Sequence, residues 1–306
     1  MRPWIATLAL FSFAGLASAD ELDDAYQALK EAQTGKNAED VLKWAPEASK
    51  LARAEAARKK PDSMTDADWK ARVGYAKDVD TFAEYALSAA AVQPGIDSAQ
   101  TVQLVDALLD MNAKSQYLSQ SAGAYINALE KTSGAAKSLD GATKILNGNP
   151  NSEDALFALA NGNSGKAPDR AMQYATRLVT VMRPKAKPEG VSDADWDRKK
   201  STMLAYGYYI AGTLSGSGQR PSYPDCDRNL RAGLPYITKQ ANMAGTAYFY
   251  LGLCNYQIGK LTSDRSKLQE ALQFSEQAAK LAGPMQATAQ NNAALIRREL
   301  GGGAKK

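Results

Sequence analysis

The sequence of 306 residues contains no histidine. This absence excludes histidine-based acid–base catalysis, histidine-dependent nucleophilic triads and the commonest zinc sites. The chain also lacks an S-x-x-K, a G-x-S-x-G and a P-loop pattern. Catalysis by a pair of carboxylates is compatible with this composition, but none of the 33 acidic residues stands out as such a pair. We therefore expect a protein that is not an enzyme and that holds neither a cofactor nor a metal.

The chain also lacks a strong excess of either charge. It has 37 basic and 33 acidic residues, which give a formal net charge of +4. The short basic runs at 58–60 and 198–200 lie beside acidic residues. Because a nucleic-acid-binding surface needs a clustered excess of lysine and arginine, we expect no nucleic-acid partner and interpret these runs as solvated helix faces.

A long apolar run occurs only at the N-terminus. Residues 1–19 combine one charge at Arg2, an apolar segment Ile5–Leu16 and small residues up to Ala19, which is typical of a cleavable secretory signal. The apolar segment is too short to cross a bilayer, and an uncleaved amphipathic cap is the alternative interpretation. We expect cleavage near Ala19 and a periplasmic or secreted protein without a membrane span. The lack of an N-x-S/T sequon favours a bacterial periplasmic setting.

Cysteine is scarce, with only Cys226 and Cys254. The two flank a predicted helical hairpin that turns near Asn242. Each lies roughly 20 Å from the turn at a rise of about 1.5 Å per residue, which places both at the same height on adjacent helices. In an exported protein this arrangement favours a disulfide, which is worth about 3 to 4 kcal/mol in the chain-entropy model. A buried thiol at Cys254 beside a free Cys226 is the alternative.

Helical periodicity is abundant after Asp20. Apolar residues recur at helical spacing, interrupted about every 15 to 25 residues by Gly, Pro or Asn, and no segment alternates like a strand. The pattern predicts an all-α fold of about 13 helices joined by short turns. The expected helices cover residues 20–34, 37–59, 65–92, 97–112, 115–132, 135–147, 151–161, 167–183, 192–215, 226–240, 244–259, 265–282 and 285–299.

Two of these helices begin with nearly the same eleven residues. KKPDSMTDADW ends at Trp69 and AKPEGVSDADW ends at Trp196, 127 positions later, with six identical positions. The paired carboxylates of Asp-Ala-Asp-Trp could suggest a metal or glycan site. Since residues i and i+2 of a helix point about 200° apart, however, these carboxylates cannot readily share a ligand. We interpret the duplication as structural, dividing the chain into related halves of about 20–146 and 147–300.

Each copy has the residues of a helix start. The N-cap is Thr65 or Ser192, whose hydroxyl can accept a hydrogen bond from the amide of Asp68 or Asp195. Acidic residues in the first turn favour the positive end of the helix dipole. An apolar residue before each cap and a tryptophan at the fourth helical position match the hydrophobic staple. Each cap should stabilise its helix by about 1 kcal/mol.

The segment from Gly245 to Pro284 resembles a tetratricopeptide repeat. In the family's order, its first helix carries Tyr248, Leu251, Gly252, Tyr256 and Gly259, and its second carries Ala271 and Ala278 before the closing Pro284. The segment departs from the family by about seven inserted residues at 260–266 and by a proline one place late. Segments 103–129 and 201–237 match loosely, and no strict 34-residue period runs through the chain.

This resemblance implies a right-handed superhelix of stacked antiparallel helix pairs over residues 20–300. Separately, we expect the polar segment 301–306 to be a disordered tail. A plain helical bundle is the alternative. By the family's geometry, the inner groove of the last unit presents five residues to a ligand and the preceding unit adds a sixth. These candidate ligand-binding residues are Tyr208, Thr246, Phe249, Leu253, Tyr256 and Gln257.

Three functions are compatible with these features. The first, which we expect, is a non-enzymatic exported scaffold that binds a protein or peptide partner in the cell envelope. The second is a glycan-binding or carboxylate-dependent carbohydrate-active protein, because eight of 14 tyrosines fall between Tyr206 and Tyr256. It predicts a deep pocket with two carboxyl groups about 5 to 10 Å apart. The third is an envelope component that self-associates into an oligomer.

Overall fold

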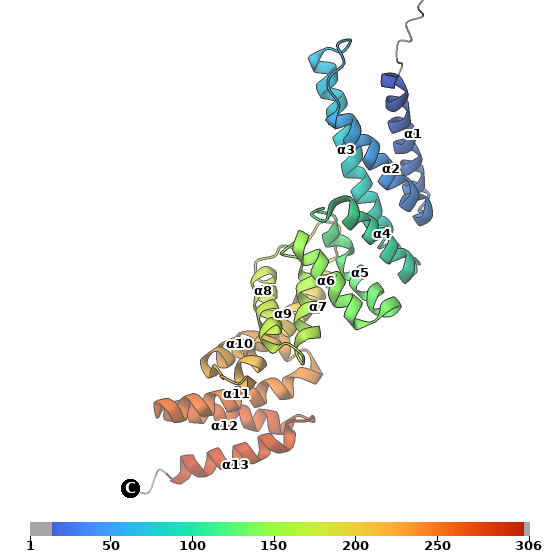
Figure 1. The fold of residues 1–306 in the computed structure, drawn as a ribbon. Helices are drawn as coiled ribbons and strands as arrows, with labels where there is room; N and C mark the ends of the chain where they lie inside the picture. The colour runs from blue at the N-terminus through green and yellow to red at the C-terminus, as the bar shows by residue number, and fades with distance from the viewer. Residues whose placement is uncertain (1–13, 303–306) are drawn as a thin grey trace, which may run out of the picture. The chain divides into compact units, whose positions relative to one another are not determined.

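The computed structural model describes residues 14–302, and all of its regular secondary structure is α-helical. Figure 1 shows the helices in chain order. The prediction of an all-α fold with about 13 helices is confirmed for this part of the chain. The helices are α1 (Ala14–Thr34), α2 (Ala38–Ala57), α3 (Asp66–Ala90), α4 (Ser98–Asn112), α5 (Leu118–Ser133), α6 (Ala135–Gly148), α7 (Glu153–Asn163), α8 (Pro168–Met182), α9 (Asp193–Ser217), α10 (Tyr223–Ile237), α11 (Ala241–Thr262), α12 (Arg265–Lys280) and α13 (Gln286–Gly302).

Both predicted terminal segments extend beyond the described residues. The predicted signal peptide, residues 1–19, lies mostly outside them, and α1 begins at Ala14, ahead of the expected cleavage position. Of the predicted tail at 301–306, the first two residues belong to α13 and the other four lie outside the description. Between Ala14 and Gly302, no helix is both long enough and apolar enough to cross a membrane.

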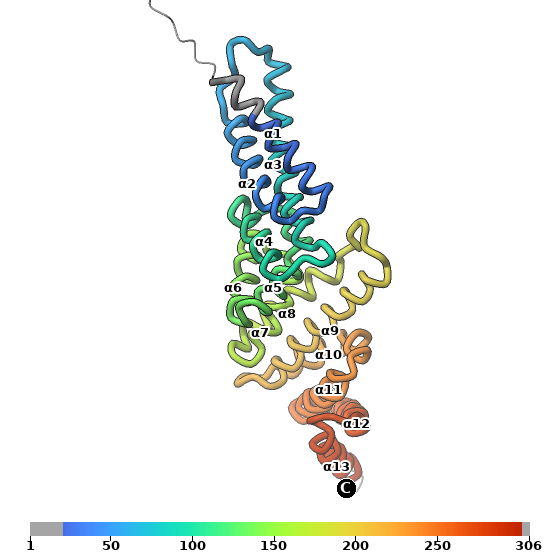
Figure 2. The backbone as a smooth tube through the Cα atoms, turned by 90° about the vertical axis from the view of Figure 1, so that its right-hand side faces the viewer, coloured from blue at the N-terminus to red at the C-terminus, as the bar shows by residue number. Residues whose placement is uncertain are grey.

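The described part of the chain divides into two compact units, one that ends at Pro150 (unit 1) and one that begins at Asn151 (unit 2). Within each unit, consecutive helices pack against each other, as the tube in Figure 2 also shows. Alternate helices are in contact as well. In unit 1, α3 contacts α1 and α5, and α2 contacts α4. In unit 2, α9 contacts α7 and α11, and α11 contacts α13. The odd-numbered helices of each unit therefore lie side by side, and we call the surface that they share the odd-helix face of that unit.

The duplicated segments start α3 and α9, which are both 25 residues long. In the two copies the same hydrogen bonds form. The hydroxyl of Thr65 accepts from the amide of Asp68, and that of Ser192 from the amide of Asp195, each at 3.1 Å. Each hydroxyl also donates to the carboxylate of the same aspartate at 2.7 Å. The predicted caps are therefore present in both copies.

An ion pair before each cap also recurs in the two duplicated segments. Lys60 forms an ion pair with Asp66, and Lys187, 127 positions later, forms the equivalent pair with Asp193. Trp196 is only 6% exposed. The carboxylates of each Asp-Ala-Asp-Trp therefore bind a lysine or a cap hydroxyl, which supports a role in helix entry.

The equivalence extends to the first three helices of each unit. Arg72 on α3 and Lys199 on α9 are 127 positions apart, and both bind carboxylates of the first helix of their unit: Asp23 on α1, and Glu153 and Asp154 on α7. Four buried positions of α2 recur in α8 at a spacing of 130. These pairs are Val41 and Ala171, Ala45 and Ala175, Ala48 and Leu178, and Ala52 and Met182.

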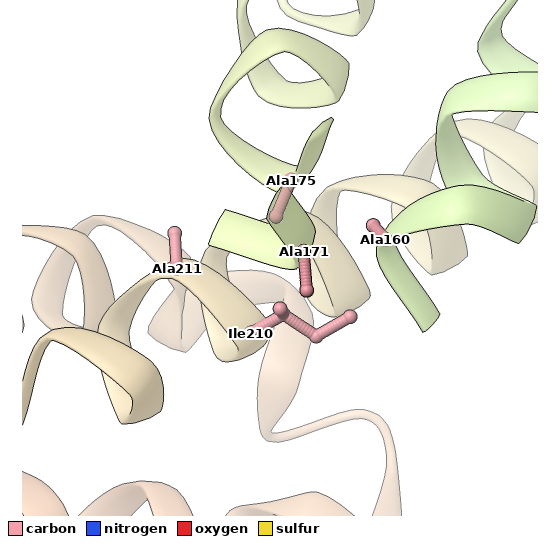
Figure 3. Close-up of a cluster of buried hydrophobic side chains, with 5 residues drawn as sticks. All are labelled: Ala160, Ala171, Ala175, Ile210 and Ala211. Carbon is pink, nitrogen blue, oxygen red and sulfur yellow. The ribbon is translucent and has the colours of Figure 1, made fainter. Parts of the chain in front are cut away.

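Small side chains dominate the core and allow close helix packing. In unit 2, Ala171 and Ala175 of α8 pack with Ile210 and Ala211 of α9 and with Ala160 of α7 (Figure 3). Glycine permits still closer approach where α9 meets α10. A Cβ at Gly212 would lie 2.5 Å from Cγ of Leu230, and one at Gly233 would lie 2.5 Å from Cβ of Tyr208. Because real Cβ atoms do not approach this closely, both glycines are required by the packing.

The predicted disulfide is present. Cys226 of α10 and Cys254 of α11 are bonded with their Cα atoms 6.3 Å apart, and both are fully buried. The bond packs against the last turn of α9, where a Cβ at Gly216 would lie 3.0 Å from each sulfur. The disulfide therefore fixes α10 to α11 directly beside the end of α9.

Candidate functional site

Three of the six predicted ligand-binding residues line one cavity. Leu253, Tyr256 and Gln257 project from α11 into a space of about 220 Å³ whose opposite wall is α13. Leu295 of α13 stands at this cavity with 55% of its surface exposed. The cavity thus combines apolar walls with the side-chain amide of Gln257.

The rim of this cavity is held by a small charged network. Tyr256 donates its hydroxyl hydrogen bond to Oε1 of Glu299 at 2.8 Å, and Lys260 reaches Oε2 at 3.2 Å. The hydrogen bond to Glu299 raises the pKa of Tyr256, and the hydrogen bond from Tyr256, together with Lys260, lowers the pKa of Glu299. Tyr256 therefore joins α11 to α13 at the rim of the cavity through Glu299.

Thr246 and Phe249 lie earlier on the same helix, and Thr246 is at the contact with α9. Thr246 forms a side-chain hydrogen bond with Tyr209, whose pKa is raised chiefly by burial. Phe249 meets the ring of Tyr250 edge to face, with centroids 5.4 Å apart. Both residues are half-buried. The α11 residues therefore extend from the contact with α9 to the cavity beside α13.

Tyr208 lies apart from the other five. It is 7% exposed, packs against Gly233 of α10 and stacks on Tyr236 at a centroid distance of 6.3 Å. Its side chain therefore belongs to the interface between α9 and α10. The next residue, Tyr209, points about 100° further around the helix and makes the contact with α11.

A row of five aromatic rings crosses the odd-helix face of unit 1. In order along the row these are Tyr75, Tyr26, Phe82, Tyr85 and Tyr117, contributed by α1, α3 and the residue that precedes α5. The centroids of successive rings lie 5.4 to 6.0 Å apart. We call this set the aromatic row. It joins three helices that are distant in sequence into one continuous ring surface.

The rings of the aromatic row remain accessible to solvent. Tyr85 is 36% exposed, and the other four are half-buried. None of these five residues was among the predicted ligand-binding residues. A signal for part of the row exists in the sequence, because Tyr75, Phe82 and Tyr85 are spaced seven and three residues apart, which places them on one face of a helix.

One end of the aromatic row is charged. Burial, together with the hydrogen bond and the negative charge of Asp23, raises the pKa of Tyr75 to about 12. The guanidinium of Arg72 lies 5.2 Å from the Tyr75 ring centre, and Lys30 lies 4.6 Å from that of Tyr26. Cations over ring faces are attracted by the ring quadrupole. The cations that contact the row therefore gather at the end formed by Tyr75 and Tyr26.

Aromatic rings also lie on the odd-helix face of unit 2. Phe157 of α7 meets Tyr206 of α9 edge to face at 5.1 Å. Tyr209, 127 positions after Phe82, continues the rings toward α11. Each unit, taken by itself, therefore has half-buried rings where its own odd-numbered helices are in contact.

Neither metal-binding clusters nor the comparisons with family models and curated proteins indicate a function for these surfaces. Within residues 14–302, no three Cys, Asp or Glu side chains are arranged to hold a metal ion. No protein-family model matches the sequence, and no curated protein shows significant similarity to it. The surfaces of the two units are therefore the basis for a functional assignment.

Proposed function

We propose that this protein is a non-enzymatic, exported helical-repeat protein that binds a segment of another protein along its odd-helix faces in the cell envelope. The observation that carries the proposal is the aromatic row of unit 1. Five partly exposed rings in continuous contact form a surface that a single folded chain does not need for its own core. Exposed contiguous apolar surface of this kind marks interaction sites.

Aromatic side chains suit this role energetically. Tyrosine offers a large, rigid contact area with a polar hydroxyl, and it is enriched among the residues that dominate binding energy. The rings of the aromatic row are already fixed by their neighbours, so little side-chain entropy is lost when a partner docks. The cavity beside Leu253 and Tyr256 on α11 would accept an apolar side chain of a partner in the same way.

Ring orientation favours a peptide over a glycan. Three of the four ring pairs in the aromatic row lie at interplanar angles of 67° to 83°. Successive faces are therefore not coplanar and do not form a flat platform for a chain of sugar rings. Steep angles instead present ring edges and ring faces in turn, which suits the varied side chains of a peptide.

The features required by the glycan alternative also lie apart. Asp169 and Asp225 face one cavity between α8 and α10, but no aromatic ring is found among the described residues that line it. Asp225 already accepts a hydrogen bond from Ser222 at 2.7 Å and pairs with Arg228 at 2.5 Å. A sugar-binding ring and a pair of carboxylates are thus not combined in this cavity.

Two further observations support the finer parts of the proposal. Gly252 allows α11 and α12 to pack so closely that an added Cβ would lie 2.6 Å from Oγ of Ser275, as expected for a tetratricopeptide-like pair. The disulfide between Cys226 and Cys254 fits an exported protein, because disulfides form and persist in oxidising compartments.

Peptide-display selection tests the proposal and does not depend on the identity of the partner. Protein lacking residues 1–19 is immobilised, and a library of random 12-residue peptides is selected against it and against a Phe82→Ala/Tyr85→Ala variant. We expect a shared motif that the wild type enriches and the variant loses. A Trp44→Ala variant, which removes a half-buried ring outside the aromatic row, should retain enrichment.

Circular dichroism must show unchanged helix content for both variants. A selection that yields no common motif would contradict the proposal, as would a motif that survives in the Phe82→Ala/Tyr85→Ala variant and in a Tyr256→Ala variant of unit 2. A parallel panel of soluble polysaccharides covers the glycan alternative, and binding there that depends on Tyr85 would favour that alternative instead.

A further inference from the structure

A large groove lined by both polar and apolar side chains lies along the even-numbered helices α8 and α10 of unit 2. Two adjoining cavities of about 630 and 520 Å³ run between α8 and α10, across the end of α9, and share Met172, Ser215 and Asp225 as lining residues. We call this space the even-helix groove. It is distinct from the odd-helix face, because all of its walls come from α8, α10, the last turn of α9 and the segments flanking these helices.

The groove presents both hydrogen-bonding and apolar side chains. Gln173 and Thr176 of α8 and Asn229 of α10 line its walls, while Met172 and Leu214 lie among them. Side-chain amides can donate and accept at once, as the peptide backbone requires. The space therefore matches an extended chain with alternating polar backbone and short side chains.

The charges along the groove have a net positive sign. Asp225 and Arg228 pair with each other at 2.5 Å, which leaves Arg177 and Arg220 without an acidic partner among the described residues, against the single carboxylate of Asp169. Arginine forms two parallel hydrogen bonds with a carboxylate, and this geometry is specific as well as strong. Two unpaired guanidinium groups in one groove are thus suited to an acidic ligand.

The basic character continues along α8. Arg170, on the same helix, and Arg183, which caps its C-terminus, are exposed and likewise form no ion pair within the described residues. Elsewhere, arginines such as Arg53, Arg231 and Arg297 are paired with carboxylates of a neighbouring helix. Charge complementarity therefore selects an anionic occupant for this surface.

We propose that the even-helix groove binds an extended acidic polypeptide segment, with carboxylates on Arg177 and Arg220 and its backbone on the amide and hydroxyl side chains between them. Polyphosphate would make no apolar contact with Met172 and Leu214, and an anionic glycan would find no ring to stack on among the described residues that line the groove. The site goes beyond the proposed function, because it uses other helices and another chemistry than the aromatic row.

Fluorescence anisotropy with two labelled peptides tests this site. The probes are nine-residue peptides that alternate Glu with Ala or Gln with Ala, titrated with protein lacking residues 1–19. The Glu peptide should bind about tenfold more tightly than the Gln peptide at low salt, and the difference should shrink as salt screens the charges. An Arg177→Gln/Arg220→Gln variant should lose about tenfold in affinity for the Glu peptide.

Two variants separate specific contacts from general charge. Arg298→Gln/Lys280→Gln removes the same net charge from exposed residues of α13 and α12, and should change affinity less than about twofold. Asp169→Asn removes the repelling carboxylate from the groove and should tighten binding about threefold. A residue that only supported the fold would not produce this gain.

Several results would overturn the proposal. These are equal binding of the Glu and Gln peptides, an equal loss in the Arg298→Gln/Lys280→Gln control, or inorganic polyphosphate that binds as tightly as the Glu peptide. The Phe82→Ala/Tyr85→Ala variant should bind the Glu peptide normally. A negative result in the anisotropy titration therefore leaves the proposal for the aromatic row intact. A negative result in the peptide-display selection likewise leaves the proposal for the even-helix groove intact.

Discussion

Removal of the disulfide should destabilise unit 2 by an amount that follows from the loop it closes. Cys226 and Cys254 are 28 residues apart, and closing a loop of this length in the unfolded chain is worth about 3.5 kcal/mol at 25 °C in the chain-entropy model. Both sulfurs are fully buried between α10 and α11. A Cys226→Ala/Cys254→Ala variant should therefore lose about 3.5 kcal/mol of the free energy of unfolding, and lost packing of the sulfurs adds to this.

Tryptophan fluorescence during urea unfolding can assign that loss to one unit. In protein lacking residues 1–19, Trp44 and Trp69 belong to unit 1 and Trp196 is the single tryptophan of unit 2. A Trp44→Phe/Trp69→Phe background therefore reports unit 2 alone, and Trp196→Phe reports unit 1. At a urea dependence of about 2 kcal/mol per molar, the unit 2 midpoint should fall by about 2 M.

The unit 1 reporter is the internal control. Its midpoint should stay within about 0.3 M of the value with the disulfide intact. A unit 2 shift smaller than about 0.5 M would refute the loop-closure reasoning. Equal shifts in both reporters would instead show that the disulfide's contribution is not confined to the unit that contains it.

Three other expectations follow from local geometry. Thr65→Ala and Ser192→Ala should each lower stability by about 1 kcal/mol, the first seen with the unit 1 reporter and the second with that of unit 2. Gly148→Ala should destabilise unit 1 by at least about 2 kcal/mol in urea unfolding, because an added Cβ would lie 1.6 Å from a backbone carbonyl oxygen. Gly74 has open space around it, so Gly74→Ala should stabilise α3 by up to about 1 kcal/mol. Changes in unfolding free energy of the same sign for the two variants would contradict this reasoning. The pKa of Tyr75 is raised to about 12, so the contribution of this group to stability is complete below about pH 10 and is lost as the pH rises through about 12. In a pH titration followed by phenolate absorbance, the Tyr75→Phe variant should therefore lack a titration step near pH 12 that the wild type shows, and its steps near pH 10 should be unchanged.

Features that depend on nearby residues could be predicted from the sequence. The caps at Thr65 and Ser192 involve a hydroxyl and an amide three residues apart, so a hydroxyl residue followed by Asp-Ala-Asp gives the same hydrogen bonds in both copies. The pairing of Cys226 with Cys254 required only a helical hairpin with a turn midway between them. Helix number follows similarly from the spacing of apolar residues and turn residues.

Features that depend on how helices face one another could not be predicted in the same way. The aromatic row brings Tyr26 and Tyr117 into one surface, although 91 positions separate them in the chain. The density of tyrosines in the C-terminal half favoured a site there instead. Tyr208 and Tyr209 show how much depends on the phase of a single helix: the first ring is buried against α10, and the next one along the chain contacts α11.

The even-helix groove also depends on how helices pack and could not be predicted from the sequence. Arg177 and Arg220 are 43 positions apart, the first on α8 and the second between α9 and α10. In the sequence, neither arginine belongs to a motif, and each is typical of a solvent-exposed residue. Only the packing of α8 and α10 on either side of α9 places both at one groove, where the lack of acidic partners among the described residues becomes apparent.

Site-specific photocrosslinking in cells that produce the protein tests most directly whether the aromatic row contacts a partner polypeptide. A photoreactive phenylalanine analogue replaces Tyr85 in the row or Trp44 outside it, and crosslinked peptides are identified by mass spectrometry. We expect one recurrent partner segment captured from position 85 and absent from position 44, and a synthetic copy of that segment should bind the wild type but not Phe82→Ala/Tyr85→Ala. Equal, scattered crosslinks from both positions, or a segment that binds the variant as well as the wild type, would show that the row is not a docking surface.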